Sequence, residues 1–489
     1  MKKIYSILSV LIISSQFSCK KLLEIPPPQT SLSAEAVFSS NETAISAMTQ
    51  LYAQASSSNI TQASFLGLSG IPGLSSDELL NFRGAGSTGQ HLTNYNRNTL
   101  SAIASTSSAH QFWVDLYGKY IYRSNRIIEG LQAQKSSEED PSSRLSAAVK
   151  RQLMGEALFI RAFSYFYLIQ MYGDVPLLTT SNYETNSTAG RTNKDFVYQQ
   201  IVRDLKEAEN NLSNSYVEAD VITSHGDTPR IRPVKWAAKA LLARVYLYIG
   251  NSDADAERES KAVIGNTNLY GLSNLGEIFK AGSFEAIWQL QPVSLGWNTQ
   301  EARAFIIPTS GPSPDNYPFR INPLLLSAFE SGDKRRTSWI NTRVIGTTTY
   351  YYPYKYKIAN LNAAVEEYST VLRLAEQYLI CSEALAKQNK ISEAQVMLNA
   401  VRHRAGLSDT PADTKEKLLD AILAERRVEL FSEFGHRWFD LKRTGKVDEV
   451  MRIAMPLKDG GEWQPYQAYY PIMPTQLNLN QNVAQTPGY

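Results

Sequence analysis

The stretch VKWAAKALLARVYLYIG at residues 234–250 decides the fold of this chain. Its apolar side chains recur with the spacing of one helix face. The residues on that face are Trp236, Ala237, Ala240, Leu241 and Tyr248. Gly250 and Asn251 follow directly, and both residue types are common where helices end. The sequence therefore predicts a helix over 234–249.

Side chains of this helix also match the first helix of a tetratricopeptide repeat, which is a pair of packed helices. The matching residues are Leu242, Ala243, Tyr246 and Gly250. Further along the chain, Ala394, Leu398 and Val401 suit a matching second helix. Because small residues let two helix axes approach closely, we predict a mostly α fold on a tetratricopeptide-like α-α solenoid scaffold.

Further helices are predicted over 145–171, 367–386, 392–404 and 414–434. The first of these is strongly apolar and is followed by the helix-stopping sequence GDVP at 173–176. In the third, Ser392 is expected to act as the N-cap. Two shorter segments, 284–292 and 347–357, are predicted to be strands.

Long irregular stretches separate the helical runs, at about 64–108, 178–195, 213–232 and 292–360. Loops of this length inside a compact protein are usually functional. We therefore expect a helical scaffold that carries ligand-binding loops.

Composition excludes some classes of protein. The hydrophobic fraction of 43% and charged fraction of 20% are ordinary for a globular chain, so the composition does not predict disorder. Without Lys2 and Lys3, the basic residues equal the 47 acidic ones. A neutral chain without a basic run gives no reason to expect a nucleic-acid partner.

The first residues resemble a bacterial lipoprotein signal. Lys2 and Lys3 precede the apolar segment 4–13, which is too short to span a bilayer. Ser18 then stands just before Cys19. We predict a signal peptide over 1–18 and lipidation of Cys19, although Gln16 and Phe17 depart from the usual cleavage box. The alternative is a conventional cleavable signal with an incidental cysteine.

Residues 19–32 are predicted to be a lipidated, proline-rich tether, because three consecutive prolines at 26–28 favour extended backbone. The helical body then covers 33–489. The other cysteine, Cys381, lies in an apolar run and is predicted to be a buried small hydrophobe.

Sequence blocks in a fixed order give the chain a family resemblance. The blocks are GEA at 155–157, YGDVPL at 172–177, RP at 232–233, AAKALLA at 237–243, RLAE at 373–376, RAGL at 404–407, ERRVEL at 425–430 and PGY at 487–489. The most specific block continues from 425–430 through Glu433, Gly435, Trp438 and Arg443. Together the blocks resemble the SusD/RagB family of outer-membrane nutrient-binding lipoproteins.

That resemblance implies a non-catalytic binding subunit on the cell exterior, lipid-anchored in the outer membrane. It also implies a partner, a SusC-like TonB-dependent transporter that the protein covers as a lid. The implied ligand is an oligosaccharide, or a peptide in some members, and no cofactor is expected, while calcium binding stays open. Lys20 and Lys21 replace the acidic residues that often follow the lipidated cysteine, so the surface location rests on the resemblance. The alternative function is an exported glycan-active hydrolase.

Charged residues near the C-terminus allow two interpretations. Glu425, Arg426, Glu429, Glu433 and Arg437 follow helical spacing. Paired carboxylates could act as the acid and base of a glycosidase. The interleaved arginines instead favour ion pairs that hold the last helices to the body. The five histidines form no zinc motif, and no catalytic serine or nucleotide-binding motif occurs.

The ligand site is predicted on the loops, where aromatic faces and polar side chains could meet a sugar. The candidate residues are Asp77, Asn81, Arg83, Tyr95, Asn96, Trp297, Asn298, Tyr317 and Tyr352. Trp297 is the preferred stacking platform, because Gly296 and Asn298 favour a turn that presents the indole. Trp288 alternates with apolar neighbours in the preceding strand and is predicted to be core. The tyrosines at 350–352 could instead be a strand with alternate residues buried.

Overall fold

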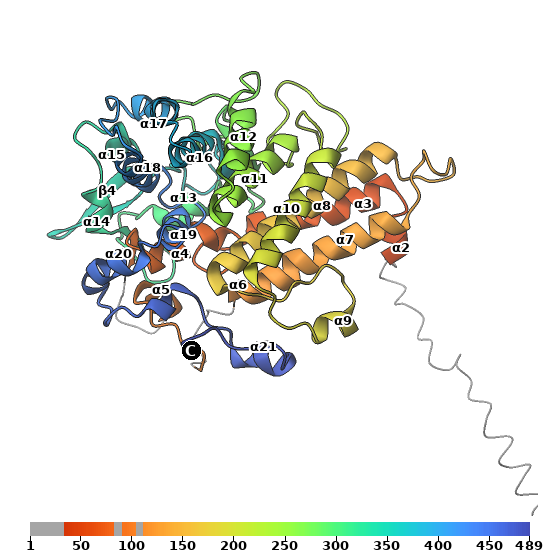
Figure 1. Ribbon diagram of the computed structural model, residues 1–489, viewed down its shortest axis with the longest axis horizontal. Helices are drawn as coiled ribbons and strands as arrows, with labels where there is room; N and C mark the ends of the chain where they lie inside the picture. The colour runs from red at the N-terminus through yellow and green to blue at the C-terminus, as the bar shows by residue number, and fades with distance from the viewer. Residues whose placement is uncertain (1–33, 83–89, 104–110) are drawn as a thin grey trace, which may run out of the picture.

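The computed structural model describes residues 34–82, 90–103 and 111–489. Its N-terminal half is a group of long helices that lie side by side (Figure 1). The long helices are α3 (Asn41–Ser57), α7 (Tyr122–Ala133), α8 (Ala147–Tyr172) and α10 (Lys194–Asn211), and this part of the chain also contains the short elements α2 (Ala34–Val37), α6 (Gln111–Val114), the π-helix η3 (Asp115–Ile121) and α9 (Tyr183–Ser187). Helix α8 is central: every residue from Gln152 to Tyr172 is buried, as expected for a helix that is apolar on all sides.

Helix pairs continue the scaffold from this group. They are formed by α11 (Lys235–Ile249), α12 (Asp253–Ile264), α16 (Leu374–Lys387), α17 (Ile391–Arg404) and α18 (Lys415–Glu429). Helix α10 packs on α11, α11 on α12, α12 on α16, and α16 on both α17 and α18. Short connections join α11 to α12 and α16 to α17. This row of helix pairs confirms the predicted tetratricopeptide-like scaffold.

Helix ends largely follow the predicted signals. Ser146 caps α8 through Val149 N, and Gly173 ends that helix with a φ of 73°. Gly250 ends α11 with a φ of 74°. The prediction that Ser392 caps the next helix is wrong, because α17 already begins at Ile391 without a side-chain cap.

Two predicted helices have different bounds. The run over 367–386 begins with strand β6 (Ser369–Arg373), and its helix starts only at Leu374. Strand β6 pairs antiparallel with β2 (Ala286–Leu290), and both strands are buried on both faces, so they lack the alternation that identifies a strand. The run over 414–434 ends at Glu429, because Ser432 and Phe434 have positive φ angles of 55° and 41°.

The predicted irregular stretches contain short elements that were not expected. They are η2 (Leu66–Ser69), α4 (Ile71–Ser75), β1 (Leu79–Asn81), α5 (Gln90–Asn96), α9, α13 (Gln300–Phe305), β3 (Phe319–Ile321), α14 (Pro323–Leu326), α15 (Lys334–Ser338) and β4 (Ile340–Ile345), while the expected strand β5 spans Thr348–Pro353. Elements this short contain too few turns to show a hydrophobic period. Only 213–232 is irregular throughout.

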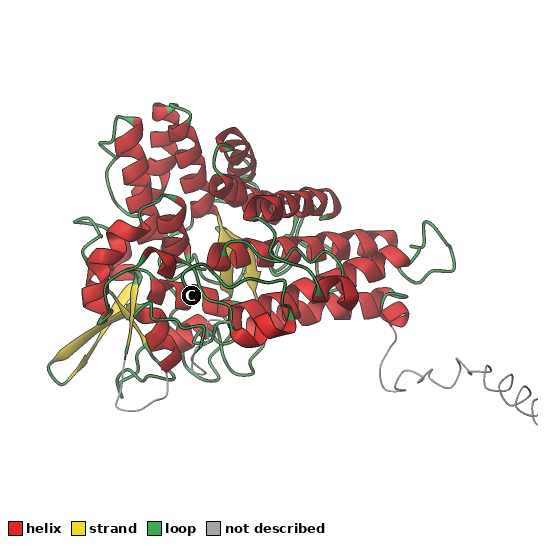
Figure 2. Cartoon of the chain, turned by 60° about the horizontal axis from the view of Figure 1, so that its bottom comes forward, coloured by secondary structure: helices red, strands yellow, loops and turns green. Residues whose placement is uncertain are grey.

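Strands β1 and β3 form one antiparallel pair, and β4 and β5 form a hairpin that reaches out from the body (Figure 2). The hairpin turns at Gly346, which has a φ of 59°. The strands predicted over 284–292 and 347–357 are confirmed as β2 and β5.

The last segment returns to the N-terminal helices. It contains α19 (His436–Arg443), α20 (Val447–Ala454), η4 (Met455–Lys458), η5 (Pro465–Ala468) and α21 (Pro474–Leu479). The amide N–H of Tyr470 donates to the carbonyl oxygen of Met171 at the end of α8. Cys381 is fully buried, as predicted. Within the parts of the chain that the structure describes, no helix has the length and low polarity needed to cross a membrane.

Candidate functional site

Glu425 and Glu429 of α18, with Glu433 just after the helix, belong to a buried group of ion pairs. We call this group the ion-pair lattice; it consists of Glu285, Arg335, Lys355, Arg373, Arg402, Arg404, Glu425, Glu429 and Glu433. Glu429 contacts Arg373 at 2.6 Å and Arg335 at 2.8 Å, and also pairs with Arg404. Glu433 contacts Arg373 at 2.7 Å.

Three arginines of the lattice keep the Glu429 carboxylate ionised. Burial opposes ionisation of Glu429, yet Arg404, Arg373 and Arg335 hold its pKa well below the ordinary value. Such a group cannot donate a proton near neutral pH. The interpretation of this segment as an ion-pair network is confirmed.

Asp77 lies inside the protein rather than on a binding loop. Its carboxylate accepts hydrogen bonds from Arg437 Nε at 2.8 Å and from Arg427 Nη2 at 2.6 Å. Burial raises its pKa, but Arg437 and Arg427 together lower it below the ordinary value. Asp77 therefore ties the β1 segment to α18 and α19, and the structure leaves it no access to a ligand.

The neighbouring candidates are also buried and bonded within the chain. Asn81 Nδ2 donates to Thr93 Oγ1 at 3.0 Å, and Asn96 Nδ2 donates to the carbonyl oxygen of Lys458 at 3.1 Å. Tyr95 is fully buried, and its ring lies 5.3 Å from that of Tyr470. These side chains hold α5 against β1 and η4, contrary to their predicted role as ligand contacts. Arg83 lies outside the described residues.

Burial along β5 changes from one end to the other. Thr348 and Thr349 at the hairpin tip are exposed, Tyr350 and Tyr351 are half-buried, and Tyr352 is buried. The strand prediction is confirmed, but the predicted alternation is wrong because the hairpin enters the body at its base. Tyr352 is thus a packing residue in this structure, with its ring 6.2 Å from that of Tyr354.

Asn298 fixes the loop that carries Trp297. Its Nδ2 donates to the carbonyl oxygen of Ala364 at 2.9 Å, and its Oδ1 accepts from the amide N–H of Glu366 at 2.8 Å. Both polar groups of the buried side chain are thus used within the protein. The prediction that Asn298 contacts a sugar is not supported, and its role is to hold the loop in place.

Trp297 lies in the predicted turn and is half-buried. Gly296 has a φ of 75°, and Trp297 N donates to the carbonyl oxygen of Ser294 at 3.1 Å. The guanidinium carbon of Arg303, on α13, lies 4.6 Å from the centre of the indole ring. The indole is thus held between a fixed turn and a cation, in part open to solvent. Trp288, by contrast, is fully buried, as predicted.

Three other half-buried aromatic residues lie on or near the strands β1, β3 and β5. Tyr317 closes a short bridge with Ser313, and the ring of Phe82 lies 6.1 Å from that of Tyr350. Helix α13 packs on β3, and β3 in turn contacts β1 and β5. We call Phe82, Trp297, Tyr317 and Tyr350 the aromatic loop face. The sequence signalled Trp297 and the tyrosines, but not Phe82 or Arg303, whose placement depends on tertiary packing.

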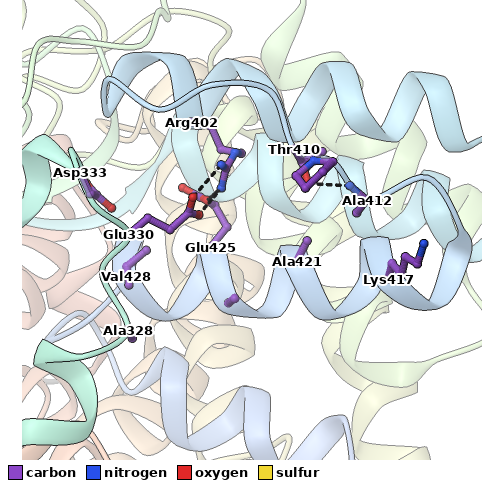
Figure 3. Close-up of a pocket in the computed structure, with 12 residues that line it drawn as sticks. Ala328, Glu330, Asp333, Arg402, Thr410, Ala412, Lys417, Ala421, Glu425 and Val428 are labelled. Carbon is purple, nitrogen blue, oxygen red and sulfur yellow. Dashed lines mark hydrogen bonds and ion pairs between the residues drawn. The ribbon is translucent and has the colours of Figure 1, made fainter.

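A cavity of about 520 Å³ lies beside α17 and α18 (Figure 3). Arg402 spans it, donating to Glu330 at 2.6 Å and to Glu425 at 3.2 Å. The hydrogen bond from Arg402 lowers the pKa of Glu330. No aromatic ring lines this cavity, and its charged side chains already have ion-pair partners. It is therefore a poor site for stacking a sugar.

The described residues contain no preformed metal-binding site. Among these residues no group of three or more His, Cys, Asp and Glu side chains is arranged to hold an ion. Calcium binding, which the family resemblance left open, stays a hypothesis.

Comparisons with known proteins match most of the chain. The family described as the SusD family, SusD/RagB, matches residues 334–489, and a SusD-like family described as "starch-binding associating with outer membrane" matches 78–247. SusD-like protein P25 of Formosa agariphila is 26% identical over 97% of this chain and 96% of its own length. A SusD-like protein of Bacteroides ovatus is 26% identical over 67% of this chain and 64% of its own length.

Solved structures show the same fold. A SusD superfamily protein from Bacteroides vulgatus has a TM-score of 0.74 at 21% identity, covering 92% of this chain and 99% of its own. A laminarin-binding SusD-like protein has a TM-score of 0.71 at 24% identity, covering 92% and 100%. Surface glycan-binding protein A from Bacteroides uniformis has a TM-score of 0.74 at 19% identity, covering 91% and 99%. With both family matches falling on the blocks that hold the helical scaffold together, the chain belongs to the SusD/RagB family.

Proposed function

We propose that this protein binds a glycan at the outer membrane without cleaving it, and that Trp297 stacks on a sugar ring. The observation that carries the proposal is the half-buried indole on a loop fixed by Asn298 and covered in part by Arg303. A rigid aromatic platform binds a sugar at little cost in conformational entropy. Tyr317, Phe82 and Tyr350 offer further half-buried rings for a ligand.

The relatives support the choice of ligand class. The matched relatives and structures include a laminarin-binding protein, a surface glycan-binding protein and a family described as starch-binding. A peptide ligand is the other possibility that the sequence left open. The aromatic loop face favours a glycan because its rings supply flat apolar surfaces.

We also propose that the protein is held in the outer membrane by a lipid on Cys19 and covers a SusC-like TonB-dependent transporter. The support is the sequence around Cys19 and the family membership, whose description includes association with the outer membrane. Cys19→Ala should move the protein from the membrane fraction to the soluble fraction. If the variant stayed with the membranes of cells that lack the transporter, the lipid anchor would be wrong.

Affinity electrophoresis of the purified protein tests the glycan-binding proposal. Gels containing laminarin, starch or other polysaccharides should retard the protein in at least one case, while incubation with that polysaccharide releases no reducing sugar. Failure to bind any polysaccharide, with binding of peptides, would replace the glycan by a peptide. Time-dependent release of sugar would show a hydrolase instead.

A further inference from the structure

A second cavity, of about 400 Å³, lies under the irregular stretch 213–232. Its lining is mostly polar and includes Ser215, Tyr216, Ser224, His225, Thr228 and Arg230. It shares no residue with the aromatic loop face. Hydroxyl groups and one guanidinium therefore line the same partly open cavity, outside the site already described.

Arg230 is 8% exposed and has no carboxylate partner within the described residues. Its Nη1 donates to the carbonyl oxygen of Ala286 at 2.7 Å, and its Nη2 donates to that of Leu269 at 2.8 Å. The rings of Tyr216 and Tyr270 lie 5.1 Å and 5.3 Å from its guanidinium carbon. A guanidinium has five N–H donors, so these two hydrogen bonds leave some of them for another acceptor.

Arg230 differs in this respect from comparable cations. In the described ranges, every other arginine that is more than nine-tenths buried pairs with an acid. These are Arg161, Arg232, Arg244, Arg335, Arg373, Arg402, Arg426 and Arg437. The basic residues that line the cavity of Figure 3 and a third cavity near α11 and α18 are also ion-paired.

Two acids lie near the cavity without neutralising Arg230. Asp227 lines the rim but is exposed, and it forms no ion pair with Arg230. Glu218 accepts a hydrogen bond from Thr228 Oγ1 at 2.6 Å instead. A buried cation without an anion is unfavourable, and carbonyl oxygens and aromatic rings compensate only part of its lost hydration.

We propose that this cavity binds an oxyanion, a carboxylate or sulfate group carried by a small ligand such as an acidic sugar, with Arg230 as its cationic partner. The planar guanidinium suits both groups because it donates two parallel hydrogen bonds. Hydroxyl groups of Ser215 and Ser224 lie on the same lining and add neutral donors. The site does not depend on stacking at Trp297.

Calorimetric titration of the full protein with glucuronate, glucose 6-sulfate, inorganic sulfate and glucose tests this site. At least one of the three anions should bind while glucose does not, and a rise in sodium chloride should weaken that binding. Which anion binds distinguishes a carboxylate from a sulfate. Arg230→Gln should weaken the binding about tenfold or more, the usual effect of losing a hydrogen bond to a charged group. Asp227→Asn should strengthen it, because a like charge leaves the rim.

Arg191→Gln is the matched control. Arg191 also donates only to carbonyl oxygens, those of Asp174, Tyr172 and Ala484, but it lines none of these cavities. The Arg191→Gln substitution should leave anion binding unchanged. If Arg230→Gln does not fold, Arg230→Lys keeps the charge but not the planar fork and should still weaken binding. Equal binding of glucose and glucuronate, no binding of any anion, or unchanged binding by the folded Arg230 variant would overturn the proposal.

Discussion

The ion-pair lattice and the loop around Trp297 lie in the same half of the sequence, but their polar side chains have different roles. In the lattice, Glu429 contacts three arginines, and every charged group has an ion-pair partner inside the protein. In the loop, Asn298 uses both its amide nitrogen and its amide oxygen to fix the backbone, while the Trp297 indole stays half-buried. A satisfied buried group supports the fold, whereas a held but partly open group is available to a ligand.

The family resemblance falls on the first of these regions. The blocks at 373–376, 404–407 and 425–430 supply Arg373, Arg404, Glu425 and Glu429 of the lattice. Trp297, and with it Arg303 and Arg230, lies in none of the blocks. Family membership therefore accounts for the helical scaffold, whereas the ligand must be inferred from the side chains on the loops.

The largest loss of stability is expected from a substitution in the ion-pair lattice. Glu429→Gln leaves Arg335, Arg373 and Arg404 short of one negative charge in a buried site. Breaking such a pair costs about 3–5 kcal/mol of unfolding free energy. Urea denaturation should show this loss, while the folded variant should keep its affinity for glycan. A loss under about 1 kcal/mol would mean that the lattice does not stabilise the fold.

A comparable loss is expected for Trp438→Ala on α19. The indole is fully buried, with its ring 6.1 Å from that of Trp463, so truncation should cost about 3–5 kcal/mol. Its indole N–H has no acceptor among the described residues, so Trp438→Phe should cost much less. Thermal melts of both variants check this order. Lost glycan binding with an unchanged melting temperature would instead place Trp438 in the site.

A smaller, pH-dependent effect is expected at Glu301, beside the loop. Burial raises its pKa from 4.5 to about 7, although Ser369 donates a hydrogen bond to it. Between these values the folded protein keeps a proton that the unfolded chain has lost. This group therefore makes stability fall as pH rises from about 4.5 to 7, and the contribution levels off above 7.

Glu301→Gln removes that dependence. The variant should gain about 3 kcal/mol relative to the native protein as the pH is raised from 4 to 8. Denaturation at several pH values measures the difference between the two proteins, so other titrating groups cancel. A difference that stays constant over this range would contradict the raised pKa.

The smallest change, a loss of glycan affinity, is expected from removing the Arg303 guanidinium beside the Trp297 indole. Arg303→Ala should weaken glycan binding by about 0.5–1 kcal/mol, since an exposed cation–π contact contributes that much to holding the ring. Arg303→Lys keeps the cation and should lose less glycan-binding free energy. Binding that is abolished by Arg303→Ala would show that the guanidinium contacts the ligand directly.

The sequence predicted the scaffold better than the site. Helices such as α8 and α11 have long apolar runs with strong stop signals at Gly173 and Gly250, so their local pattern was sufficient. Asp77 and Asn298 were mistaken for ligand contacts because a polar residue in a predicted loop is as suitable for an internal bond as for a ligand. Their partners, Arg437 and Ala364, lie far away in the sequence. That Arg230 has no carboxylate partner within the described residues likewise depends on tertiary packing, because neither Asp227 nor Glu218 pairs with it.

A paired measurement on Trp297→Ala and Trp288→Ala tests the central claim most directly. Glycan affinity and unfolding free energy are determined for each variant by calorimetry and urea denaturation. Trp297→Ala should lose about 2 kcal/mol of binding free energy with little change in stability. Trp288→Ala, which empties a fully buried site, should lose about 3–5 kcal/mol of stability with binding per folded molecule retained. Equal affinity of Trp297→Ala and the native protein would contradict the account.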